Sequence, residues 1–112
     1  MQFTINGVKW AILNVRATDK RLMRSDGVLT LGVTDWNDKT IYLSDALHGA
    51  LLEHVLCHEL CHAVVFSYGI YLPVETEEWL CNYMADHGKE IIYLLDDLLQ
   101  RMNNARMVFN DK

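Results

Sequence analysis

The sequence predicts an α+β fold, in which a small, mostly antiparallel sheet is followed by helices. Short apolar segments alternate with turn residues through the first 44 residues, residues 50–66 contain neither glycine nor proline, and apolar residues recur at intervals of three and four from 91 to 102. The 112 residues are 51% hydrophobic and include one proline. This composition suits a single domain spanning residues 1–112.

The first two strands are predicted as a hairpin. Asn6-Gly7 favours a two-residue type I′ turn, and it separates apolar segments at residues 3–5 and 8–15. The second of these segments has apolar side chains on both faces, which indicates a central strand.

Three elements follow the hairpin. A polar connection covers residues 16–27 and includes a helical turn near residues 20–24. Apolar and polar residues alternate from 28 to 34, which predicts a half-buried strand. A turn at residues 35–39 then leads into a short strand, Thr40–Ser44.

Two helices that bear the candidate site come next. The first is predicted from about residue 46 to residue 67, with Ser44-Asp45 as its cap. The second begins near Glu77, with Thr76 as its cap.

A third, C-terminal helix is predicted after His87-Gly88, which interrupts or ends the second. It is amphipathic, and we expect its apolar stripe to lie in the core because a small sheet needs a helix packed on it. The stripe consists of Ile91, Leu94, Leu95, Leu98, Leu99 and Met102.

The first predicted helix contains the motif H-E-x-x-H at His58, Glu59 and His62. Four residues along an α-helix advance by about 40° and roughly 6 Å, so both imidazoles leave the same face and can bind one metal ion. Glu59 stands beside that ion and is not needed as a ligand. In such sites zinc lowers the pKa of a water molecule and the carboxylate accepts its proton. The alternative is a pair of buried histidines beside a solvent-facing glutamate.

A third protein ligand is needed, and Glu75, Glu77 and Glu78 cluster where the second helix starts. Glu78 shares a helix face with Asn82, a polar residue among apolar neighbours that needs a partner. We therefore predict Glu78 as the third ligand and Asn82 as the residue that orients a ligating imidazole. For Glu75 and Glu77 the favoured interpretation is attraction to the positive end of the helix dipole.

Hydrolysis at such a site also requires a hydrogen-bond donor for the oxyanion. The candidates are His54, Tyr68, Tyr71 and His87. Tyr71 is the first choice, because it lies in the loop between the two ligand helices and carries a phenolic donor. His54 lies one turn before His58 on nearly the same face, and an ordinary partly buried histidine is its alternative interpretation.

Charge and composition exclude several classes of function. The formal charge of -5 and pI near 5.4 disfavour nucleic-acid binding, which depends on basic residues. The N-terminus lacks the features of a signal peptide, and no apolar run approaches the ~18 residues that span a membrane, so we expect a cytoplasmic protein. Three cysteines do not suggest a disulfide framework. Cys57 and Cys61 are interpreted as small packing residues, with a cysteine-containing metal site as the alternative.

These motifs resemble a known family. His58-Glu59-Leu60-Cys61-His62, followed by Glu78-Trp79-Leu80-Cys81-Asn82-Tyr83-Met84-Ala85, is similar to the H-E-x-x-H motif and the E-x-x-A-N-x-F-A helix of the ImmA/IrrE-type metallopeptidases, which are compact, zincin-like gluzincins. Cys81 stands at the alanine position and Met84 at the phenylalanine position. Residues 31–35 and 41–43 resemble the strand pair that leads into the metal helix of such peptidases.

The resemblance implies that His58, His62 and Glu78 bind Zn²⁺ and that Glu59 is the general base. It also implies a protein or peptide substrate, such as a transcriptional repressor of a mobile element, bound as an added strand along a sheet edge. Thr40–Ser44 is the predicted edge, with an interior position as the alternative. Manganese or another divalent ion is the alternative to zinc. A noncatalytic zinc-binding module for protein interaction is the alternative to a peptidase.

Overall fold

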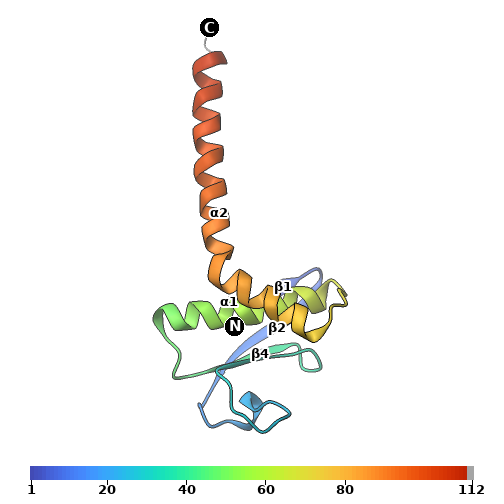
Figure 1. Cartoon of the computed structure of the whole chain (residues 1–112). Coiled ribbons are helices and arrows are strands. Elements are labelled where there is room, and N and C mark those ends of the chain that lie inside the picture. The colour runs from blue at the N-terminus through green and yellow to red at the C-terminus, as the bar shows by residue number, and fades with distance from the viewer. Residues whose placement is uncertain (111–112) are drawn as a thin grey trace.

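The first 44 residues form a four-stranded sheet, and the chain after them forms two long helices (Figure 1). The computed structural model describes residues 1–110. In chain order the elements are β1 (Gln2–Ile5), β2 (Val8–Val15), the 3-10 turn η1 (Lys20–Leu22), β3 (Gly32–Asp35), β4 (Thr40–Ser44), α1 (Gly49–Ser67) and α2 (Val74–Asn110). The predicted α+β class is confirmed.

β1 and β2 form the predicted hairpin. Asn6 and Gly7 have φ angles of 49° and 77°, as a type I′ turn requires. The strand order is β1-β2-β4-β3, so β2 pairs with β1 on one side and with β4 on the other. The prediction of a central second strand is therefore confirmed.

Two features of the sheet differ from the prediction. β2 and β4 run parallel, so the sheet is mixed, although the other two neighbouring pairs are antiparallel. β4 is an interior strand and not the predicted edge, because β3 pairs with it on its outer side and residues 41–44 are all buried. The neighbour of a short strand depends on where the connecting chain returns, and the pattern of side chains within the strand does not specify that.

β3 is shorter than predicted and begins only at Gly32. The residues before it turn back over η1, because the hydroxyl and the amide of Thr30 both donate to the carbonyl of Leu22 at 2.8 Å. At Gly32 itself the strand lies directly against α1. A Cβ atom there would stand 2.9 Å from Val55 Cγ1 and 3.1 Å from Glu59 Cγ. The missing side chain thus lets β3 approach the motif helix closely.

α1 begins at Gly49 rather than near residue 46, and it ends at Ser67 as predicted. Ser44 stays in the sheet and does not cap the helix. The N-cap position is taken by His48, whose side chain makes no capping hydrogen bond. Gly49 has a φ of 61°, a left-handed value that interrupts right-handed helix geometry, so the helix cannot extend toward β4.

The two predicted C-terminal helices are one continuous helix, α2. Thr76 is not its cap, because α2 begins at Val74, directly after Pro73, whose fixed φ suits the entry to a helix. His87-Gly88 does not end it, since one helical glycine costs only about 1 kcal/mol and the turns on both sides persist. α2 changes direction partway along, and its C-terminal half projects away from the rest of the molecule (Figure 1).

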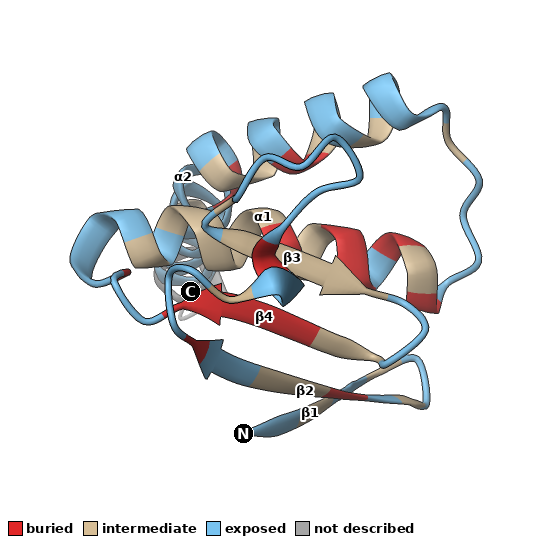
Figure 2. Cartoon of the chain, turned by 90° about the horizontal axis from the view of Figure 1, so that it is seen from below, coloured by how far each residue is buried: buried red, intermediate tan, exposed pale blue. Residues whose placement is uncertain are grey.

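α1 packs against the sheet, and α2 packs against α1 (Figure 2). The indole N–H of Trp10 in β2 donates to the hydroxyl of Ser67 at 2.8 Å, which joins the sheet to the end of α1. The buried residues around Trp10 are Ile41, Leu43, Leu47 and Ala63. A second buried cluster, on the other face of the sheet, consists of Val15, Leu22 and Tyr42.

By length and composition alone, α1 is long and apolar enough to cross a membrane. One side of α1 faces the sheet and another faces α2, and 28% of this apolar segment is buried.

The apolar stripe that was predicted to lie in the core is exposed. Five of its residues each have between 47% and 56% of their surface exposed, namely Ile91, Leu94, Leu95, Leu99 and Met102. These residues lie on the projecting half of α2. The prediction is wrong for a single copy of the chain, because α2 leaves α1 before it reaches them.

Candidate metal centre

Two helices bring three potential ligands to one point. His58 and His62 leave the same face of α1, and Glu78 approaches them from the second turn of α2. The Nε2 atoms of the two histidines are 3.2 Å apart. The Glu78 carboxylate lies 3.3 Å from His58 Nε2 and 2.9 Å from His62 Nε2. This group could hold a metal ion, and it consists of the three residues predicted as ligands.

The donor atoms of the three residues lie within 4.8 Å of one another, close enough to bind one metal ion. A zinc ion with bonds of about 2.0–2.1 Å keeps neighbouring ligand atoms roughly 3.3 Å apart, which is close to the 3.2 Å between the two histidine nitrogens. The two Glu78 distances belong to different oxygens of its carboxylate. Two imidazole nitrogens and one carboxylate are also a common donor set for a divalent ion of this size.

His62 is oriented by Glu77 and not by Asn82. The Glu77 carboxylate lies 2.5 Å from His62 Nδ1, so that this nitrogen donates to it and Nε2 is left for the metal. Asn82 is exposed and does not orient the imidazole as predicted. Glu77 does so instead, although its predicted role was only attraction to the positive end of the helix dipole. A signal was present: Glu77 shares its helix face with Cys81, and Cys81 is fully buried against α1.

Glu59 is buried beside the three ligands without joining them. Its carboxylate lies 4.0 Å from His58 Nε2. The Thr34 hydroxyl lies 2.8 Å from that carboxylate and 3.0 Å from the Glu59 carbonyl, and it donates to this residue from β3. Burial raises the pKa of Glu59 above its usual value, while the Thr34 hydrogen bond and the two histidines act to lower it. Thr34 was not identified from the sequence.

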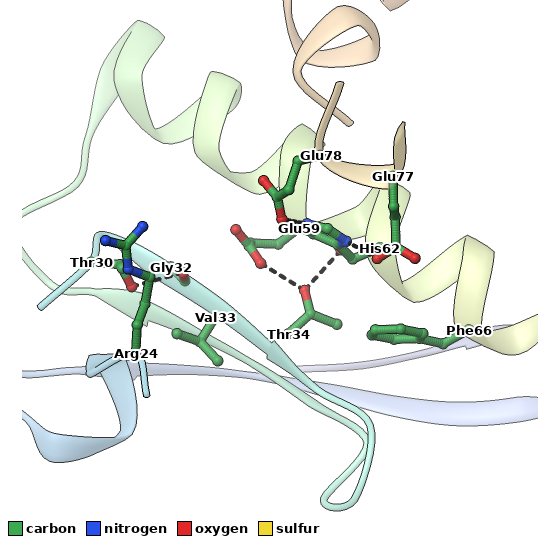
Figure 3. A pocket seen from close by; sticks show the side chains of 10 residues that line it. All are labelled: Arg24, Thr30, Gly32, Val33, Thr34, Glu59, His62, Phe66, Glu77 and Glu78. Carbon is green, nitrogen blue, oxygen red and sulfur yellow. Dashed lines mark hydrogen bonds and ion pairs between the residues drawn. The ribbon is translucent and has the colours of Figure 1, made fainter. Parts of the chain in front are cut away.

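The metal group and Glu59 open onto a cavity of about 370 Å³ between β3 and the two helices (Figure 3). Glu59, His62, Glu77 and Glu78 line it on the helical side. Arg24 lies at the other end, with its guanidinium 2.9 Å from Asp26. A second cavity of about 230 Å³ adjoins the same group on the side of His58 and Glu59.

The four candidate oxyanion donors differ in their exposure and in whether they line a cavity. Tyr71 is 96% exposed and Tyr68 is 57% exposed, and neither lines one of the two cavities described above. His87 contacts Glu90. His54 lines the second cavity, and its Nδ1 lies 3.4 Å from the carboxylate of Asp86 on α2. Of the four, His54 is the one that shares a cavity with His58 and Glu59.

The cysteines lie between the helices and outside the metal group. The Cys57 thiol is 3.5 Å from the carbonyl of Met84, and Cys81 is fully buried. Burial raises the thiol pKa of both residues. Both thiols therefore stay protonated near neutral pH, as is expected of packing residues.

Comparisons of this chain with protein-family models, curated proteins and solved structures give no match.

Proposed function

We propose that this chain is a zinc-dependent, zincin-like metallopeptidase that hydrolyses a protein substrate. The observation that carries the proposal is the position of Glu59. Its carboxylate is buried on a cavity wall, 4.0 Å from a ligating nitrogen, and is not one of the three metal donors. A purely structural zinc site has four protein ligands and no use for a free carboxylate beside it.

Zinc, when bound, lowers the pKa of a water molecule and polarises a carbonyl group. Glu59 accepts the proton of the attacking water and then transfers it to the leaving amine. Thr34 fixes the orientation of the Glu59 carboxylate from β3. Glu77 keeps the ring of His62 turned so that Nε2 faces the metal position.

The substrate binds as an extended segment along β3. With β4 in the interior, β3 is the edge strand on this side, and within residues 1–110 no strand pairs with its outer side. Thr34 of this strand contacts Glu59, and Gly32 lines both cavities. An added strand is held by its backbone, so it places a peptide bond beside Glu59 with little regard to sequence.

His54 is the proposed donor for the oxyanion. It shares the second cavity with Gly32 of β3, and with His58 and Glu59. The Asp86 carboxylate lies 3.4 Å from Nδ1 and orients the ring, and an N–H on Nε2 would be available to a developing negative charge.

The test is the metal content of the purified protein, followed by exposure of a peptide library derived from a whole proteome to the zinc-loaded protein. We expect stoichiometric zinc and cleavage at peptide bonds, which stops on addition of a chelator and returns with zinc. Bound zinc without cleavage, in a protein that instead forms stable complexes, would support the noncatalytic interaction module. Protein that binds no divalent ion with useful affinity would exclude both functions.

A further inference from the structure

The projecting half of α2 carries an apolar surface that one copy of the chain leaves in water. We define the α2 stripe as Ile91, Leu95, Leu98 and Met102. We propose that two copies of the chain associate through this stripe, with their α2 helices side by side and antiparallel. This association is independent of the metal centre, which lies near the other end of α2.

The spacing of the α2 stripe is that of helix–helix packing. Its members are separated by four, three and four residues, the repeat that keeps one face of an α-helix against a partner helix. Ile92, Leu94 and Leu99 flank the stripe and are 50%, 53% and 47% exposed. The apolar face of this segment is therefore wider than expected for a helix that packs against no partner.

The area available is enough for a stable pair. The stripe and its three flanking residues are large apolar side chains at about half exposure, and together they expose on the order of 600 Å² of apolar surface per copy. This area is at the upper end of the apolar patches found on ordinary monomers. Two copies together reach roughly 1,200 Å², where specific interfaces begin. Among residues 1–110, no other element lies beside the projecting half of α2 (Figure 1), so a second copy can approach it freely.

The charges around the stripe favour a protein partner over a lipid surface. Glu90 and Asp97 lie on one flank of the stripe, on the same side of α2 as Leu94, and Asp96 lies on the opposite face. An anionic bilayer attracts helices whose polar face is basic. The acidic residues thus lie between residues 90 and 97 of this segment, while the basic residues Arg101 and Arg106 lie after them.

This separation of charge sets the orientation. In a parallel pair, the positions that flank the stripe would bring Arg101 of one copy next to Arg106 of the other, which is a repulsive contact. In an antiparallel pair, Leu95 of one copy lies opposite Leu98 of its partner, and Ile91 lies opposite Met102. Arg101, which lies 2.9 Å from Asp97 of its own helix, is then close to the part of the partner's helix that carries Glu90, and the two sheets lie at opposite ends.

Sedimentation of the full chain between about 1 and 200 μM tests the association. We expect a monomer–dimer equilibrium, with the dimer at twice the 13.0 kDa chain mass. Leu95→Glu and Leu98→Glu, made separately, should each raise the dissociation constant by about 30-fold or more. The matched controls are Gln100→Glu and Asn104→Glu, which add the same charge outside the stripe and should leave the constant within about twofold.

Arg101→Glu tests the orientation. It should weaken an antiparallel pair, because it places a negative charge against the partner's acidic part, whereas it should tighten a parallel pair by removing repulsion between arginines. Circular dichroism and metal content should be unchanged in all variants, since all these residues except the half-buried Leu98 are exposed and all lie far along α2 from the metal group. A chain that stays monomeric at 200 μM, or that binds anionic lipid vesicles through the same leucines, would overturn the proposal.

Discussion

Both nitrogens of the His62 ring are held by consecutive residues of α2. Glu77 lies 2.5 Å from Nδ1, and Glu78 lies 2.9 Å from Nε2. One turn of α2 therefore supplies the third potential metal ligand and also the carboxylate that contacts the other nitrogen of His62. The position of α2 on α1 thus determines whether the metal group forms at all.

The first prediction concerns metal binding. One zinc should copurify per chain, and His58→Ala, His62→Ala or Glu78→Ala should each remove most of it, because three protein donors do not tolerate the loss of one. Glu77→Ala should retain the site but weaken zinc affinity by about 10–100-fold, as is usual when a group that orients a ligand is lost. Competition with a chromogenic chelator measures these affinities.

Glu75→Ala is the matched control for metal binding. Glu75 is exposed in the first turn of α2 and lies outside the metal group. Zinc affinity should therefore be unchanged in this variant. Equal losses in Glu75→Ala and Glu77→Ala would mean that the helix dipole, and not the contact with His62, accounts for the effect.

The second prediction separates hydrolysis from metal binding. Glu59→Gln keeps the shape of the side chain but cannot accept a proton, so it should retain zinc and lower kcat by about a hundredfold or more. Glu75→Gln serves as the control for the substitution itself. Loss of zinc in Glu59→Gln would instead identify Glu59 as a ligand and favour the structural interpretation of the site.

The third prediction concerns pH. Hydrolysis needs ionised Glu59, and the Thr34 hydrogen bond lowers the pKa of this carboxyl by stabilising its charged form. Thr34→Val removes that bond, so the pKa of Glu59 should rise and kcat/KM should begin to fall at a higher pH than in the wild type. Thr4→Val, at an exposed position in β1, should leave the acid limb of the profile in place. A profile that does not move in Thr34→Val would show that Thr34 has no part in tuning Glu59.

The fourth prediction tests the oxyanion donor. His54→Ala should lower kcat by about a hundredfold with little change in zinc content, because a donor to the transition state is lost. Tyr71→Phe should stay within about twofold of the wild type, since this exposed side chain lines neither cavity described above. The opposite result, with Tyr71→Phe impaired and His54→Ala active, would restore the donor predicted from the sequence.

The fifth prediction concerns the approach of β3 to α1. A Cβ at position 32 would stand 2.9 Å from Val55 and 3.1 Å from Glu59, so Gly32→Ala must displace the strand from the helix. We expect the free energy of unfolding in urea to fall by about 1–3 kcal/mol. Asn14→Ala, at an exposed position of β2, should change it by less than about 0.5 kcal/mol. An unchanged stability in Gly32→Ala would mean that β3 and α1 have room for a methyl group between them.

Features that depend on residues a few positions apart were predictable. Asn6-Gly7 requires positive φ angles that suit a type I′ turn, and the hairpin followed from that local preference. His58 and His62 lie on one face of α1 because any helix places residues four apart on the same side. Helix phase also placed Glu78 among the metal donors, although it lies on a different helix.

Features that depend on where distant segments meet were not predictable. Glu77 and Asn82 were equally able to orient an imidazole, and only the rotation of α2 on α1 places Glu77 against His62. β4 has the short, flanked pattern of an edge strand, yet the return of β3 covers its outer side. A sheet edge is a property of the assembled strands and not of any single one.

The apolar stripe of α2 is an example of the same limit. Its spacing at residues 91–102 shows that one face of a helix avoids water, and that inference is local. Whether this face meets its own sheet or another molecule depends on the direction in which α2 leaves α1. That direction depends on the residues of α2 that precede the stripe and pack on α1, so the sequence pattern of the stripe carries no information about it.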